Sequence, residues 1–123
     1  MIETIVPETM RKSYDLGHFA PAVKADGFIF VSGVIGKGDG AEDEFRSAWE
    51  TVGMVLGEAG ASFADIVDTT LYIVDLAANA AIMARVKDEF ILPPYPASTW
   101  IGAAGLIRPA ARAEIKVIAR MPS

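Results

Sequence analysis

The Asp26-Gly27 pair, with a strand-forming run after it, constrains the fold more than any other feature of the sequence. An Asp-Gly pair supplies the positive φ angles that a two-residue hairpin turn needs. The run that follows, Phe28 to Val31, consists of aromatic and β-branched residues, which favour strands. The sequence therefore predicts a β-hairpin over 23–31, and Ser32-Gly33 ends its second strand.

Two segments have the periodicity of amphipathic helices. In 43–59 apolar residues recur at three- and four-residue steps, which predicts a helix with one buried stripe. Acidic residues at its start and Gly60 after its end fit the two termini of such a helix. In 76–90 apolar residues stand four apart, and Pro93-Pro94 stops the chain beyond them.

Three further segments are typical of strands. The nearly unbroken β-branched and aromatic run 66–74 predicts a central strand that is buried on both faces. Two more strands are expected at about 98–103 and 113–119, joined by a turn around Arg108-Pro109, and the amino end has room for one other. This order predicts a two-layer α+β fold in which two helices pack on one face of a mixed sheet.

The second face of this sheet carries too many apolar side chains for an isolated subunit. Two helices cannot cover all of them, and an apolar face on so small a sheet most simply means that subunits pack against it. The sequence therefore predicts a closed homo-oligomer. The residues in question are Phe28, Phe30, Tyr72, Val74, Trp100 and Ile118.

Composition limits the classes of function. The 123 residues are expected to form a single domain, 1–123, and the 52% of apolar residues fit a globular core. The chain has no cysteine and one histidine, His18, which excludes thiol catalysis, cysteine or His-pair zinc sites and histidine-based triads within one chain. No metal is expected.

Charge and segment composition also indicate partners and location. The net charge is −5 and no basic run occurs, so nucleic acid is not an expected partner. The amino end lacks the layout of a signal peptide, and no apolar run reaches the roughly 18 residues of a membrane helix. We expect a cytoplasmic protein that has no membrane partner and binds a small molecule.

Several segments resemble the Rid (YjgF-like) family of enamine and imine deaminases, in matching order and spacing. The match runs from about Gly17 to Ala119. Its pieces are Gly17 to Gly33, Leu56 to Ser62, Thr69 to Leu76 and Ala113 to Ala119. The resemblance implies a chorismate-mutase-like α+β fold and a homotrimer whose three sheets form a central barrel, with ligand clefts between neighbouring subunits. It also implies hydrolysis of reactive enamines and imines to ammonia and a 2-oxo acid, without a cofactor.

The resemblance also points to site residues. Glu114 stands where the family has the glutamate thought to position the attacking water, and Ser32 and Gly33 stand where backbone groups meet the ligand. A carboxylate in a mostly apolar cleft can act as a proton shuttle. The alternative from sequence alone is that Glu114 is an ordinary surface or cross-strand charge on the same strand face as Lys116.

The chain differs from the deaminase branch at the positions that bind the substrate. Ser98 stands where that branch has an arginine that binds the substrate carboxylate, and losing such a contact costs about 1.5–3 kcal/mol. Phe19 replaces a hydroxylated aromatic residue, and Trp100 stands where a smaller residue is common. Met83 occupies the position of a frequent asparagine. These changes identify the chain as a divergent member of the family.

One hypothesis is that Arg108, or Arg112, reaches the cleft and replaces the missing cation from another backbone position. The leading functional prediction is a hydrolase of an imine, enamine or related carbonyl compound, with an altered substrate. One alternative is a non-catalytic ligand-binding or regulatory trimer. The other is an endoribonuclease, which is less favoured because the net charge is negative.

Overall fold

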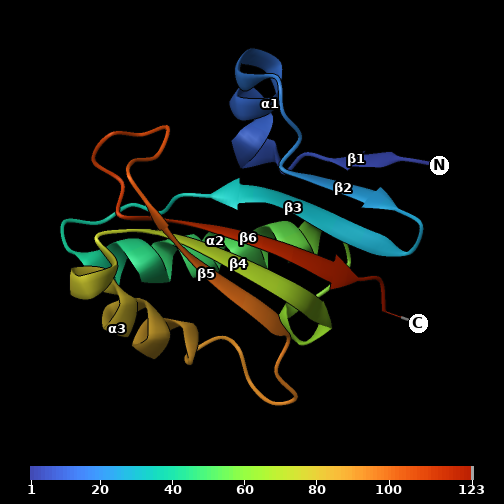
Figure 1. The fold of residues 1–123 in the computed structure, drawn as a ribbon. Helices are drawn as coiled ribbons and strands as arrows, with labels where there is room; N and C mark the ends of the chain where they lie inside the picture. Colours follow the sequence, from blue (N-terminus) through green and yellow to red (C-terminus); the bar gives the residue numbers. More distant parts are fainter. Residues whose placement is uncertain (123) are drawn as a thin grey trace.

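The structure, a computed structural model, describes residues 1–122 as one mixed six-stranded sheet with helices (Figure 1). The strand order is β1-β2-β3-β6-β4-β5, in which only β4 and β5 run parallel. The strands are β1 (Glu3–Ile5), β2 (Ala22–Ala25), β3 (Phe28–Val34), β4 (Ile66–Val74), β5 (Ala97–Ala103) and β6 (Ala113–Arg120). The helices are η1 (Glu8–Met10), α1 (Arg11–Gly17), α2 (Ala41–Glu58), η2 (Phe63–Asp65) and α3 (Leu76–Lys87).

The predicted hairpin is confirmed. Strands β2 and β3 pair antiparallel, and Ala25 lies opposite Phe28 across the turn. Asp26 and Gly27 have φ angles of 51° and 82°, the left-handed conformations that a primed two-residue turn requires. The sequence of the turn therefore sets the register of the hairpin.

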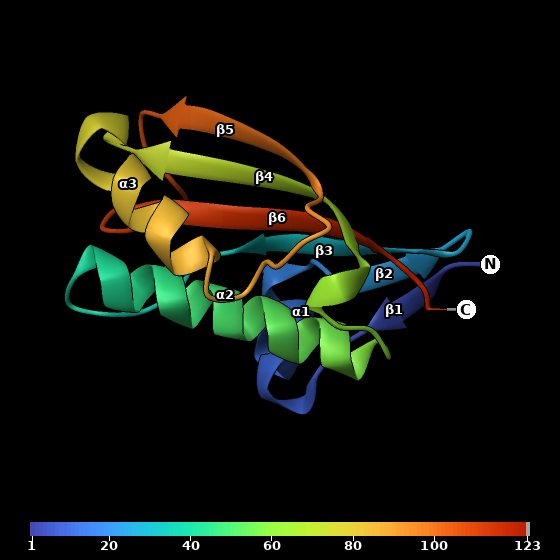
Figure 2. The same cartoon turned by 90° about the horizontal axis from the view of Figure 1, so that it is seen from below.

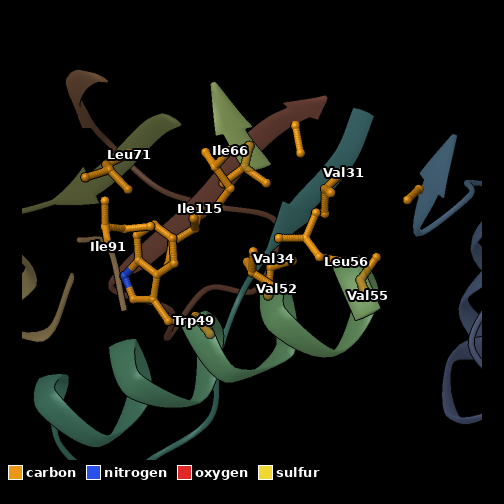
Figure 3. Packing of buried hydrophobic residues seen from close by; sticks show 14 of the residues in the cluster. Val31, Val34, Trp49, Val52, Val55, Leu56, Ile66, Leu71, Ile91 and Ile115 are labelled. Atoms are coloured by element: carbon orange, nitrogen blue, oxygen red, sulfur yellow. The ribbon is translucent and has the colours of Figure 1, made fainter. Parts of the chain in front are cut away.

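Helices α2 and α3 cover one face of the sheet, as predicted (Figure 2). Helix α2 begins at Ala41, two residues before the expected start, and Gly60 follows it with a φ of 88°. Figure 3 shows the apolar stripe of α2, including Trp49, Val52 and Leu56, beneath the strands. Helix α3 ends at Lys87, three residues early, because 88–90 form a turn.

Helix α1 was not predicted. It begins directly after η1, lies at the β1–β2 end of the sheet in Figure 1, and none of its residues is buried. A helix that buries no side chain needs no apolar stripe, so hydrophobic periodicity could not reveal it. Its end is marked by His18, which has a φ of 59°.

The face of the sheet opposite α2 and α3 is uncovered in the single chain. Phe28 and Phe30 are 42% and 40% exposed there. The prediction that β4 is buried on both faces is wrong for the single chain, because Val67 is exposed and from Asp68 onward buried residues alternate with partly exposed ones. Trp100 was assigned to this face wrongly: it pairs with Leu71, which faces the helices, and Ile101 takes the open-face position beside Tyr72.

No helix within residues 1–122 is long and apolar enough to cross a membrane.

Candidate functional site

A pocket of about 640 Å³ opens where strand β3 continues beyond the start of β2. It brings together four of the residues that the sequence singled out, which are Phe19, Ser32, Gly33 and Glu114. Further lining comes from the end of β3 and the residue after it, from α2, from the segment around α1 that leads to β2, and from the loop between β5 and β6. These residues include Met10, Pro21, Val34, Ile35, Thr51 and Ile107.

A β-bulge shapes the floor of the pocket. Val31 pairs with Val117 and Val34 with Ile115, so β3 carries one residue more than β6 between these pairs. Bulges of this kind bend a strand and re-aim its side chains. The extra length falls at Ser32 and Gly33.

Ser32 is fixed by two hydrogen bonds to the segment that precedes β2. Its backbone N–H donates to the carbonyl of Pro21 at 2.9 Å, and its hydroxyl donates to the carbonyl of Ala20 at 2.6 Å. Because the hydroxyl proton is used in this way, the Ser32 oxygen can still accept a hydrogen bond from a ligand.

Glu114 lies on β6 opposite Tyr72 of β4, and its side chain folds over the backbone of Gly33. A Cβ atom built on Gly33 would lie 2.0 Å from Oε2 of Glu114. No side chain fits between the two, so this close approach is what requires glycine at position 33. The bulge and the glycine together let a half-buried carboxylate rest against β3.

The pocket has one charged lining residue, Glu114, and within residues 1–122 no cation lies at ion-pair distance from it. Lys116 on the same strand face makes only a long contact, 3.5 Å from Nζ to the carbonyl of Val31. No ion pair between Glu114 and Lys116, or between Glu114 and a residue of a neighbouring strand, is present in the described part of the chain. An unneutralised carboxylate in a mostly apolar pocket is suited to move protons or to bind a cation.

Arg108 and Arg112 do not reach this pocket. Arg112 donates from its backbone N–H and from Nη1 to the two carboxylate oxygens of Glu44, at 2.7 Å each, and Glu44 is only 2% exposed. Arg112 also donates from Nη2 to the carbonyl of Asp39 at 3.1 Å. Arg108 donates to the carbonyl of Gly36. In the protomer neither arginine supplies the missing cation, and both fasten the β5–β6 loop to α2 and the loop before it.

The remaining predicted residues also lie outside the pocket of one protomer. Ser98 and Trp100 belong to the edge strand β5, where they pair with Thr69 and Leu71, and β4 separates them from β6. Met83 is fully buried in the core. Ser98 and Trp100 can therefore join the pocket only from another copy of the chain.

Sequence reasoning missed Ile107, Thr51 and Glu44. Ile107 lines the pocket from an exposed loop, and Thr51 does so from the side of α2. Glu44 stands among acidic residues at the start of α2, and nothing in that run distinguishes it. Within residues 1–122, no group of three histidine, cysteine, aspartate or glutamate residues could hold a metal ion.

A family model described as Endoribonuclease L-PSP matches residues 10–121. The chain belongs to this family, also called Rid or YjgF. Among curated proteins, the RutC family protein YjgH of Escherichia coli (strain K12) is 32% identical, and the alignment covers 96% of this chain and 94% of YjgH. Reactive Intermediate Deaminase A, chloroplastic, of Arabidopsis thaliana is 28% identical over 94% of this chain and 65% of that protein.

Solved structures of the Rid family have the same fold. A structure of protein YJGH has a TM-score of 0.89 at 29% identity, with 98% of this chain and 97% of that chain covered. A YjgF-family member from Mycobacterium tuberculosis has a TM-score of 0.86 at 25% identity, with 98% and 100% covered. The chorismate-mutase-like α+β fold predicted from sequence is confirmed.

Proposed function

We propose that this Rid protein is a small-molecule hydrolase, which converts an imine or enamine into a carbonyl compound and ammonia at Glu114. The observation that carries the proposal is the Glu114 carboxylate, which is half-buried over Gly33 in a largely apolar pocket and has no cation of residues 1–122 at ion-pair distance. A relative of similar sequence is named a reactive intermediate deaminase, which supports the same class of reaction.

The proposed chemistry needs only a base and a trapped water molecule. Glu114 accepts a proton from water as the water oxygen attacks the imine carbon, and it then returns the proton to the nitrogen. This first transfer gives the carbinolamine R₂C(OH)–NH₂. Glu114 then passes the proton of that hydroxyl group to the nitrogen, the C–N bond breaks, ammonia leaves and the carbonyl forms, so that R₂C=NH and H₂O give R₂C=O and NH₃. An enamine first takes a proton on carbon to become the imine. The oxygen of Ser32 and the backbone at Gly33 are the groups that would orient the substrate.

The complete site is proposed to form between subunits of a homotrimer. The open face of the sheet, with Phe28 and Phe30 about two-fifths exposed, has the apolar character of a surface that subunits bury. In such an assembly β5 of a neighbouring copy would bring Ser98 and Trp100 toward the pocket. A hydroxyl at position 98 cannot neutralise a carboxylate, so the substrate is proposed to differ from 2-imino acids.

The test is ammonia release from imines generated in solution, with and without a carboxylate group. Wild-type protein should accelerate hydrolysis of at least one imine, and Glu114→Gln should lose 10²-fold or more of that rate, on the order of a general base's contribution. Glu50→Gln is the matched control, because Glu50 is exposed on α2 outside the pocket and its replacement changes the net charge equally.

A non-catalytic binding trimer is the second candidate, and the loss of the arginine at position 98 favours it. This candidate replaces the first if no imine is hydrolysed faster than without protein, while metabolites raise the melting temperature and are recovered unchanged. Endoribonuclease activity, the word in the family description, has less support. The net charge is −5, and among the described residues the one charged side chain that lines the pocket is an acid, Glu114, which repels phosphate.

A further inference from the structure

The charge of the pocket restricts the ligand more than its shape does. Four basic residues lie within six positions of Glu114 in the sequence, and none of them lines the pocket. Arg120 is exposed at the far end of β6, and the other three make their polar contacts elsewhere. Arg108 binds the carbonyl of Gly36, Arg112 binds the buried Glu44, and Lys116 extends toward the carbonyl of Val31. The ligand itself is thus the available counterion for the carboxylate.

We infer that the pocket selects small compounds whose nitrogen carries a positive charge and that have no carboxylate, namely protonated imines and amines with an apolar side chain. The inference rests on the proposed function for its reactive ligand, the imine, but the preference for a cation follows from the part of the pocket that one chain supplies. It also distinguishes this chain from a protein that binds the anion of an amino-acid-derived imine.

The size of the preference follows from elementary electrostatics. Even in the dielectric constant of water, two unit charges about 4 Å apart change an affinity roughly fivefold. Replacing an attracted cation by a repelled anion therefore changes the affinity by about tenfold or more, and the half-buried position of Glu114 increases this effect.

The walls of the pocket define the rest of the ligand. Phe19, Pro21 and Val34 present apolar surface, and Ile107 contributes a side chain that is 92% exposed in the protomer. The loop that carries Ile107 is fastened on its carboxyl side by the contacts of Arg108 and Arg112, so Ile107 is held as part of the rim. A branched aliphatic or aromatic group fits these walls.

A protonated imine also suits the reaction proposed for Glu114. Its carbon is more electrophilic than that of the neutral imine, and the carboxylate stabilises the positive charge until water attacks. The balance is R₂C=NH₂⁺ and H₂O giving R₂C=O and NH₄⁺, with Glu114 carrying the two protons of the water, one after the other, to the nitrogen. No oxidant, reductant or cofactor enters this step.

The test compares three probes with the same branched chain: isobutylammonium, isobutanol and isovalerate. Dissociation constants are measured by calorimetry or NMR at low ionic strength for wild type, Glu114→Gln and the control Glu50→Gln. Wild type and Glu50→Gln should bind isobutylammonium at least about tenfold more tightly than isovalerate. In Glu114→Gln this ratio should fall close to one.

The inference is overturned if isovalerate binds wild type as tightly as isobutylammonium, if isobutylammonium shows no saturable binding, or if Glu114→Gln keeps the wild-type ratio. These outcomes are separable from the fate of the proposed hydrolysis. If the probes bind in the expected order but no imine is hydrolysed, the proposed hydrolase activity is refuted and the inferred preference for cations stands. If only carboxylate-bearing imines are hydrolysed, the proposed hydrolase activity stands and the inferred preference for cations is refuted.

Discussion

Replacing Gly33 with alanine displaces the Glu114 carboxylate without removing it. The new Cβ would lie 2.0 Å from Oε2 and 2.7 Å from Cδ of Glu114, whereas ordinary contacts between such atoms begin near about 3.5 Å. The carboxylate must therefore move by roughly 1–1.5 Å. Gly33 does not have a positive φ, so alanine introduces no backbone strain. Rotating the glutamate away should cost about 1 kcal/mol or less in the free energy of unfolding.

The expected functional loss is much larger than the loss of stability. A misplacement of about 1 Å at a reacting group costs on the order of 10²-fold in rate. The assay is kcat/KM for ammonia release, beside thermal unfolding, for Gly33→Ala and for the control Gly57→Ala. Gly57 lies in α2 with nothing within 4 Å of an added Cβ. Its variant should therefore keep full activity, and its free energy of unfolding should rise by about 0.5–1 kcal/mol. The reasoning is refuted if Gly33→Ala keeps wild-type activity while Glu114→Gln loses it.

Three further predictions concern the surrounding fold. Arg112→Met leaves the buried Glu44 without its guanidinium partner, and the free energy of unfolding in urea should fall by about 2–4 kcal/mol, below the full cost of a buried pair because Arg112 is partly exposed. A loss under about 0.5 kcal/mol would contradict this. Hydrogen bonding to Arg46 holds the pKa of Glu89 below its ordinary value of 4.5, so Glu89→Gln should destabilise the protein at pH 7. Because that stabilisation is lost as the pH falls through the lowered pKa, the difference from wild type should vanish in strong acid, and a constant difference would refute the assignment. Phe30→Glu on the open face should convert a trimer to monomers in sedimentation, and a monomeric wild type would contradict the proposed assembly.

Local sequence predicted most of the fold because most elements carry their own signals. The Asp26-Gly27 turn needs only two residues with positive φ, and the stripe of α2 repeats over eighteen residues. Helix α1 gave no such signal, since it buries nothing. The face of Trp100 was assigned wrongly because it depends on the register of β5 against β4, which no local pattern encodes.

The candidate site was only partly predictable. The resemblance to the Rid family singled out Glu114, Ser32 and Gly33, and the structure brings these residues into one pocket. The pair formed by Glu44 and Arg112 spans 68 positions, so its partners become neighbours only through the fold. The hypothesis that a turn arginine replaces the missing cation rested on nearness in sequence, which does not determine where a guanidinium points.

The most direct measurement is a map of backbone amide chemical shifts during a titration with isobutylammonium. We predict that the largest changes occur at Ser32, Gly33, Ile107 and Glu114, around the carboxylate that has no cation beside it. Changes centred instead on the separate hollow between β1 and α1, or changes at Ser32 and Gly33 that persist unaltered in Glu114→Gln, would contradict the account.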